Sequence, residues 1–159
     1  MVTITLRANG SQQLKRTLVR WTEAITDLRP AYEEIADRFA SMELLLFATE
    51  GASGGAPWAP LSPGYRTWKE RNYPGRPILV RTGDLRRDLT RRPFGIEVIT
   101  TDTLRVGAKV PYARYHQTGT PRMPRRPPVN LTEAQRQELV KIVQAYILGY
   151  IKNDQPRSR

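Results

Sequence analysis

Pro111-Tyr112-Ala113-Arg114-Tyr115-His116-Gln117-Thr118-Gly119-Thr120 holds the only histidine of the 159-residue chain. It joins an expected strand to a segment rich in arginine and proline. Its first proline can open a single helical turn, in which Tyr112, Tyr115 and His116 share one face and Gly119 takes the left-handed position at the end. Such a histidine is either catalytic, or packed with a ring nitrogen bonded to a backbone carbonyl or a tyrosine hydroxyl.

The residues before this stretch predict a β-hairpin with strands near 95–101 and 104–109, because apolar and polar side chains alternate there. A two-residue turn would place Val98 opposite Arg105, whereas a three-residue loop would pair Val98 with Val106. A slip of one residue moves every side chain to the opposite face of the sheet. We therefore expect the three-residue loop.

Two apolar stripes with helical spacing predict helices from Ser11 to Gly51. The stripes consist of Leu14, Leu18, Trp21, Ile25 and Leu28, and then of Tyr32, Ile35, Phe39, Met42 and Leu46. Pro30 either separates two helices or kinks a single long one. A coiled-coil seam is the alternative for these stripes, but at this short length we expect core-facing surfaces. A last helix is predicted after Thr132, an N-cap with Gln135 three residues later.

These elements predict an α+β fold, in which a small antiparallel sheet packs against long N-terminal helices and a C-terminal helix. Alternation of Val2, Ile4 and Leu6 adds a strand near 2–8 to the hairpin. We expect one domain over residues 1–152 and a flexible tail over 153–159. Composition predicts loops at 51–63, 72–77 and 118–130.

Two short helices are expected between these loops, with Ser62 and Thr82 as their N-caps. Trp58 and Trp68 are candidate core anchors, and Leu85 faces inward on the second short helix. The outer face of that second helix is expected to carry Arg86, Arg87, Arg91 and Arg92.

The net charge of +11 lies mainly in the middle of the chain. Residues 51–130 hold 13 Arg and 2 Lys against 5 acidic residues, which gives +10. Such a patch can bind phosphates through counterion release or acidic protein surfaces through charge complementarity, or it can simply be solvated. No apolar run reaches the ~18 residues of a membrane span, and no signal peptide is recognised at Met1–Leu6. The absence of cysteine is consistent with the reducing environment of a cytoplasm, and it excludes disulfides and thiolate metal sites.

No catalytic or cofactor constellation is recognised in the sequence. The acidic residues nearest to His116 are Asp102 and Glu133, so no metal-ligand cluster surrounds the histidine. No Gly-x-Ser-x-Gly elbow and no phosphate-binding P-loop is present. We therefore expect no enzyme, no cofactor and no bound metal, and a structural role for His116.

A basic DNA- or RNA-binding protein is the alternative function. Arginine suits phosphate, and the tyrosines and tryptophans interleaved with the arginines of residues 51–130 can stack on bases. However, the sequence contains no helix-turn-helix, zinc-finger or RNA-binding strand signature.

Several short motifs occur in a characteristic order. Pro57-Trp58-Ala59-Pro60-Leu61-Ser62 with a downstream Lys69 is followed by Ile78-Leu79 and Thr82-Gly83-Asp84-Leu85. After the hairpin come Tyr112-Ala113-Arg114-Tyr115-His116-Gln117-Thr118-Gly119 and Arg126-Pro127. From residue 39 to about 150, the chain resembles the tailed-phage virion morphogenesis family, the Mu-like tail completion or neck proteins. Many relatives continue from the Arg-Pro pair into an apolar Phe-Leu-Gly segment, where this chain has Pro127-Pro128-Val129-Asn130-Leu131.

The resemblance implies a structural protein of the virion, located at the head–tail junction and assembled in the host cytoplasm. It implies a homo-oligomeric ring of six copies between the head connector and the tail, with head-closure or connector proteins and tail terminator proteins as partners. Transient contact with packaged DNA is a further expectation, and no membrane is involved. The residues of the family motifs are Trp58, Leu61, Lys69, Leu79, Thr82, Gly83, Leu85, Tyr112, Ala113, His116 and Gly119.

Seven arginines are candidates for contact with a partner. They are Arg86, Arg87, Arg91, Arg92, Arg122, Arg125 and Arg126, and they face either acidic residues of an adjacent subunit or DNA. The three expected loops are the segments that we expect to reach neighbouring rings or subunits.

Overall fold

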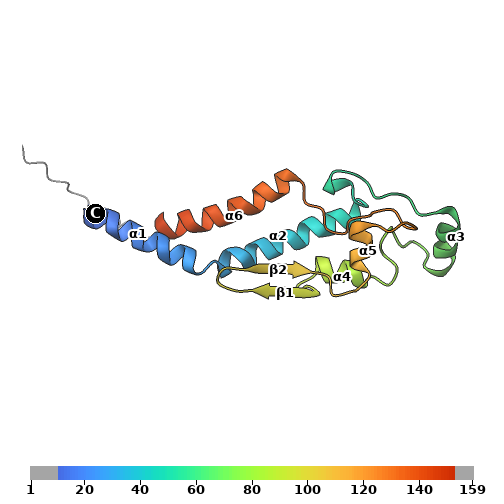
Figure 1. Cartoon of the computed structure of the whole chain (residues 1–159), viewed down its shortest axis with the longest axis horizontal. Helices are drawn as coiled ribbons and strands as arrows, with labels where there is room; N and C mark the ends of the chain where they lie inside the picture. The colour runs from blue at the N-terminus through green and yellow to red at the C-terminus, as the bar shows by residue number, and fades with distance from the viewer. Residues whose placement is uncertain (1–10, 153–159) are drawn as a thin grey trace, which may run out of the picture.

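A computed structural model describes residues 11–152 as an elongated α+β fold with six α-helices and a two-stranded antiparallel sheet (Figure 1). The elements are α1 Ser11–Thr26, α2 Arg29–Ala48, the 3-10 helix η1 Ala52–Gly54, α3 Pro63–Asn72, α4 Asp84–Thr90, β1 Ile96–Ile99, β2 Leu104–Gly107, α5 Ala113–Thr118 and α6 Glu133–Lys152. The α+β prediction is confirmed. The strand expected near 2–8 and the tail expected over 153–159 lie outside the described residues. None of the described helices has the length and apolarity that a membrane crossing requires.

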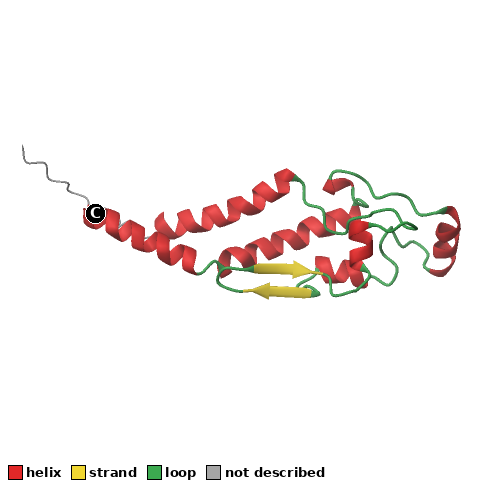
Figure 2. Ribbon diagram, in the orientation of Figure 1, coloured by secondary structure: helices red, strands yellow, loops and turns green. Residues whose placement is uncertain are grey.

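Helix α2 is the central element of the fold. It lies between α6 on one side and the hairpin with α4 on the other (Figure 2). The predicted stripe on α2 is confirmed in its second half, where Phe39, Met42 and Leu46 are buried. Pro30 lies in the first turn of α2, and α1 ends before it, so the chain forms two helices and not a single kinked one.

Two buried clusters lie along α2. Near its C-terminal end, Phe47 packs edge-on against Trp58, with 5.3 Å between ring centroids. Nearer its middle, Phe39 packs edge-on against Phe94 at 5.6 Å. Trp58 is therefore the core anchor that its motif suggested. Trp68 is not a core anchor, because it is 44% exposed on α3.

The predicted register of the hairpin is wrong by one residue. Val98 pairs with Arg105, and Glu97 pairs with Val106. The inward face of β1 therefore carries Glu97 and Ile99, while Val98 faces outward. The expectation failed because it assumed that the inward face is wholly apolar; Glu97 turns inward to bind Arg92.

The predicted core face of α1 is also wrong. Leu18, Trp21 and Ile25 are 59%, 46% and 54% exposed. The buried side of α1 contains Ala24, which is fully buried, and α1 packs along α6. A small residue such as alanine lets two helix backbones approach closely. The large apolar side chains of α1 lie beside this contact and stay open to solvent.

The joint between α1 and α2 is held by two distant segments. The Leu28 N–H donates to the carbonyl oxygen of Thr101 at 2.8 Å, and the Tyr32 hydroxyl donates to that of Asp102 at 2.9 Å. On the other side, the Tyr146 hydroxyl of α6 donates to the carbonyl oxygen of Asp27 at 3.0 Å. The hairpin turn and α6 therefore fix the angle between the two N-terminal helices.

The predicted helix starts are confirmed for α3 and α6. Ser62 precedes Pro63 at the start of α3, and Thr132 and Gln135 form a reciprocal capping box. Thr82 is not an N-cap. Gly83 occupies that position with a φ of 97°, and the Thr82 hydroxyl instead donates to the Asp84 carboxylate.

Arg92 links three acidic side chains and ties the chain after α4 to α2. Its guanidinium donates to Glu33, to Asp37 at 2.9 Å and to Glu97 at 2.6 Å. Burial alone would raise the pKa of Glu97. The hydrogen bonds from Arg92 and from the Phe94 N–H outweigh that effect, and the pKa is lowered. Arg92 is thus a structural link within the fold and does not lie on an open outer face of α4.

Replacing Arg92 with methionine should lower the free energy of unfolding by about 1–3 kcal/mol, because the largely buried carboxylate of Glu97 loses its partner. Urea denaturation followed by circular dichroism measures the change. Arg91→Met is the matched control, because Arg91 is exposed, and it should stay within about 0.5 kcal/mol of the parent chain. Equal effects of the two variants would contradict the role assigned to Arg92.

Glu43 is a buried carboxyl on α2, and burial raises its pKa to about 8. Between the ordinary value of 4.5 and 8, the folded chain holds a proton that the unfolded chain releases. Stability from this group is therefore complete below pH 4.5 and is lost as the pH rises to 8, with a slope of up to about 1.4 kcal/mol per pH unit.

Glu43→Gln should remove that slope, because glutamine does not titrate. Urea denaturation of both chains across this pH range measures it. The variant should equal or exceed the parent in stability at pH 8 and above. Parallel pH profiles for the two chains would show that Glu43 does not hold its proton in the fold.

Candidate functional site

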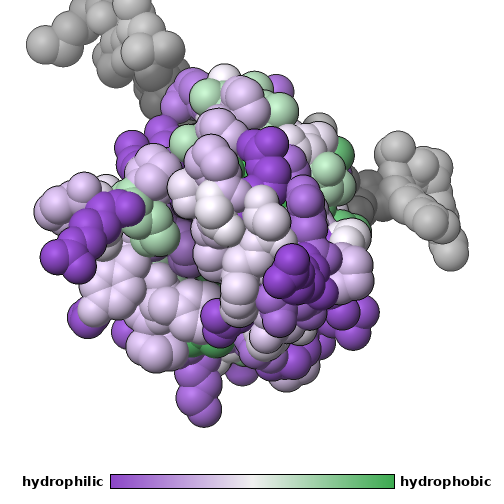
Figure 3. Space-filling model, turned by 90° about the vertical axis from the view of Figure 1, so that its right-hand side faces the viewer, coloured by the Kyte–Doolittle hydropathy of each residue, from purple (hydrophilic) through white to green (hydrophobic). Residues whose placement is uncertain are grey.

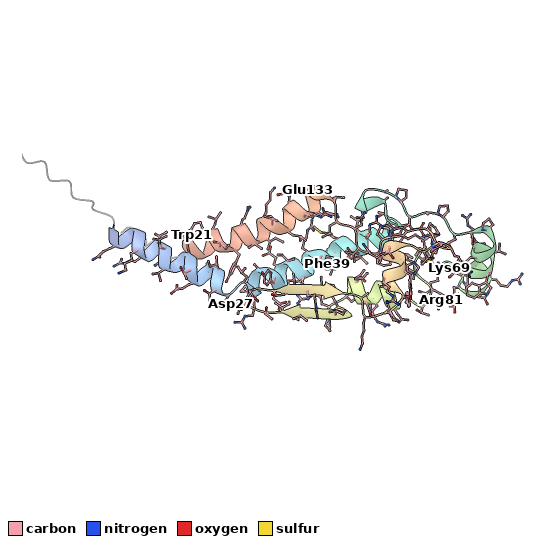
Figure 4. The ribbon with its side chains drawn as sticks, viewed as in Figure 1. Trp21, Asp27, Phe39, Lys69, Arg81 and Glu133 are labelled. Carbon is pink, nitrogen blue, oxygen red and sulfur yellow. The ribbon has the colours of Figure 1, made fainter. Side chains whose placement is uncertain are left out.

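The family-motif residues, which are scattered along the sequence, gather around one cavity. Its volume is about 690 Å³, and it lies among α3, the turn at 77–80, the start of α4, α5 and residues 122–126. Eight of the eleven motif residues line it, namely Leu61, Lys69, Leu79, Thr82, Gly83, Leu85, Tyr112 and His116. We call this cavity the motif pocket. It lies toward the end of the molecule that carries α3, where Figure 4 labels Lys69 and Arg81.

Lys69 and Glu50 hold the turn at 77–80, which forms one wall of the motif pocket. The buried Lys69 ammonium donates to the carbonyl oxygen of Pro77 at 2.5 Å, and Glu50 accepts the Ile78 N–H at 2.6 Å. Burial lowers the pKa of Lys69, while the nearby charge of Glu50 opposes the shift. These contacts hold a tight turn whose third residue is Leu79.

Leu79 has a φ of 62°, which is uncommon for a bulky side chain. Such a conformation persists only where the surrounding contacts enforce it, and it occurs often at binding sites. Here the enforcing contacts are those of Lys69 and Glu50. The result is a leucine held against the motif pocket by a strained backbone.

Arg126 also lines the motif pocket. Its side chain is buried, and it donates to the carbonyl oxygens of Ala59 at 2.6 Å and Pro60 at 2.8 Å. Its backbone N–H donates to the carbonyl oxygen of His116 at 2.9 Å. The segment at 118–130 is therefore packed onto the body of the protein, and Arg126 is an internal residue and not part of an open basic arm.

His116 lies on α5 with its ring edge-on to Tyr112. Its Nδ1 atom is buried and has no hydrogen-bond partner among the described residues, so the expected bond to a carbonyl or a tyrosine hydroxyl is not made by this nitrogen. Burial lowers the pKa of His116, and the charge of Arg126 lowers it further, so the imidazole is neutral near pH 7. Gly119 ends α5 with a φ of 78°, but its ψ of 175° lies outside the left-handed helical region.

The motif pocket contains cations and apolar side chains but no carboxylate. Lys69, Arg81, Arg122 and Arg126 line it, and Leu61, Leu79, Leu85 and Met123 supply apolar surface. Across residues 11–152, no group of three or more His, Asp or Glu side chains is placed to hold a metal. With a single neutral imidazole and no acid beside it, this arrangement is suited to binding an anionic group.

The seven candidate arginines are not brought together. Arg126 is buried, and Arg92 is bound to three carboxylates. Arg87 pairs with Asp84 at 2.8 Å, and Arg125 donates to the carbonyl oxygen of Gln117 at 2.9 Å. Arg122 is exposed at the rim of the motif pocket. Arg81 lies at the same rim but was not among the residues predicted from the sequence. The position of its side chain depends on the turn after Pro77, which the local pattern does not predict.

Lys69→Met should lower the free energy of unfolding by about 1–3 kcal/mol, because the carbonyl oxygen of Pro77 and the carboxylate of Glu50 both lose a cation. Thermal and urea unfolding measure the loss. Lys109→Met is the matched control, since Lys109 is exposed and its ammonium has no partner within the described part of the chain. Unchanged stability in Lys69→Met would refute the supporting role of Lys69.

Comparison with known proteins gives one match. The sequence profile of the phage virion morphogenesis family matches residues 10–148, which is most of the chain. Neither the curated proteins nor the solved structures contain a significant match. The matched region includes every described element up to the last turn of α6 and all residues of the motif pocket. The chain therefore belongs to the phage virion morphogenesis family.

Proposed function

We propose that this protein is a structural component of the phage head–tail junction, a neck or tail completion protein that forms a ring of six copies between the head connector and the tail. Family membership carries the proposal, because it assigns the chain to virion morphogenesis. The motif pocket supports a binding role, since it offers cations and apolar side chains without an acid–base pair.

The open face of α1 supports association between copies. Leu18, Trp21 and Ile25 lie within one stripe of the helix and are about half exposed, and Val140 and Leu148 of the neighbouring α6 are exposed as well. Contiguous exposed apolar surface on a soluble protein marks an interaction site. We therefore assign this face, at the end of the molecule where Figure 4 labels Trp21, to the contact between subunits.

The opposite end of the molecule supports contact with a different protein. Tyr65 and Trp68 are exposed on α3, and their rings stack with centroids 5.5 Å apart. The rest of this end is largely hydrophilic, with few hydrophobic patches (Figure 3). Exposed aromatic residues in polar surroundings are typical of the anchors of protein–protein interfaces. In the proposed arrangement, α1 faces other copies and α3 faces a head or tail protein.

A phage that lacks this gene should produce filled heads and complete tails that remain separate. Electron microscopy of the lysate measures the fraction of joined particles, and supplying the parent gene on a plasmid should restore them. Joined, infectious particles in the absence of the gene would overturn the proposal.

Replacing Leu18 and Ile25 together by glutamate should abolish this rescue and prevent ring formation, because each subunit would bring two new charges into an apolar contact. Circular dichroism should show an unchanged fold, since both side chains are exposed. Gln12→Glu is the control on the same helix: it adds the same kind of charge at an exposed position away from the stripe, and it should rescue normally. Normal rescue by the double variant would exclude the α1 face as the subunit contact.

A DNA-binding function is less well supported than the structural role in a ring. Of the candidate arginines, Arg126 is buried and Arg92 is bound to three carboxylates, so these two are not available for phosphate contacts. A gel-shift titration across a salt series separates the two functions, because a DNA-binding protein would bind tightly at low salt and lose affinity steeply as salt rises.

A further inference from the structure

We propose that the motif pocket binds an extended peptide segment of a partner protein, in which an Asp or Glu side chain stands beside a large apolar side chain. The inference rests on the proposed function for the partner, which is another protein of the head–tail junction. It adds the chemistry by which that partner is recognised.

The first argument is the unbalanced charge of the pocket. Buried cations in proteins are normally paired with a carboxylate. Arg126 is buried, yet within residues 11–152 it forms no ion pair, and its bonds go to the neutral carbonyls of Ala59 and Pro60. No Asp or Glu lines the pocket, and Arg81 and Arg122 stand exposed at its rim. A carboxylate from outside would supply the missing negative charge.

The second argument is the apolar surface beside these cations. Leu61, Leu79, Leu85 and Met123 line the same cavity. A volume of about 690 Å³ is in the range of sites that enclose small ligands, and it holds a few amino-acid side chains. Duplex DNA presents phosphates on a wide, polar cylinder, and it would leave this apolar lining unused. A peptide with alternating acidic and apolar residues matches both features.

The third argument is an unused polar atom. His116 Nδ1 is buried, lines the pocket with its ring and has no partner among the described residues. Buried polar atoms without a hydrogen bond are rare in native proteins, and each needs an explanation. Rotation of the imidazole ring would turn this nitrogen toward the pocket, where a peptide N–H or C=O group would satisfy it.

The pocket is also held open before any ligand arrives. Lys69 fixes the turn that carries Leu79, and Arg126 ties residues 59–60 to α5. A site whose side chains are already positioned loses less conformational entropy on binding than a mobile one. This rigidity favours recognition of a short segment with useful affinity.

The test uses overlapping short peptides that cover the head-connector and tail proteins encoded in the same phage genome, each labelled with fluorescein. Fluorescence anisotropy with the full chain at near-physiological salt measures the affinity. Bound peptides should contain Asp or Glu next to Leu, Ile, Val, Met or Phe. Exchanging that acid for its amide should weaken binding about tenfold or more, which corresponds to about 1.4 kcal/mol.

Matched charge-reversal variants locate the site. Arg81→Glu with Arg122→Glu should weaken binding at least about tenfold, whereas Arg105→Glu with Lys109→Glu, which makes the same change of net charge outside the pocket, should not. Equal weakening by both pairs, no weakening by either, or no preference for acidic peptides would overturn the proposal. Displacement of the peptide by duplex DNA at lower concentration would reassign the pocket to nucleic acid.

These outcomes are separate from those of the deletion experiment. If no peptide binds while the gene is still needed to join heads to tails, the pocket proposal fails and the proposed function stands. If particles join without the gene while an acidic peptide still binds in the pocket, the proposed function fails instead.

Discussion

The buried guanidinium of Arg126 is the interaction on which the outer half of the molecule depends. It reaches the carbonyl oxygens of Ala59 and Pro60, which are 67 and 66 residues away in the sequence, while its own N–H caps α5 at His116. The adjoining Pro127 carbonyl accepts the indole N–H of Trp58, which belongs to the core beside α2. One short segment thus joins the core, the first proline-rich loop and α5. The guanidinium makes the link to the loop, because it carries several N–H donors that no apolar side chain of the same size has, while the links to α5 and to Trp58 are made by the backbone of Arg126 and Pro127.

The fold places two different kinds of exposed surface at opposite ends of its long axis. At one end, α1 packs on α6 and keeps an apolar stripe open; at the other, α3 and the motif pocket offer aromatic, cationic and apolar groups. The long helix α2 runs between them and carries half of the buried hydrophobic residues in the described part of the chain. Contacts among identical copies favour broad apolar surface, whereas recognition of a different protein favours specific polar groups in a pocket. This division agrees with the proposed arrangement, in which α1 faces other copies and α3 faces a different protein.

Local sequence patterns predicted most of the helices, both hairpin strands and the capping box of α6, because these depend on neighbours within one or two turns. The failures share a cause in long-range chemistry. The register was wrong because Glu97 faces inward, and it does so only because Arg92 brings a cation to that side of the sheet. The exposure of Leu18 follows from the way in which α1 meets α6, which helical periodicity does not encode. The motif residues were chosen by their order along the sequence, but the convergence of eight of them around one cavity, with Arg126 in its lining, depends on a turn and a loop that no spacing predicts.

The left-handed backbone at Leu79 has a consequence for how the protein can be engineered. Glycine adopts a φ of 62° without the steric cost that a leucine side chain incurs, so the backbone alone would favour glycine at this turn. The leucine side chain offsets this steric cost, because it packs against the buried cluster that contains Phe47 and Trp58. Replacing Leu79 with glycine would therefore relieve the backbone but remove side-chain packing from the core and from the lining of the motif pocket. A thermostable version of this protein should be built by changes elsewhere, with residue 79 left as leucine.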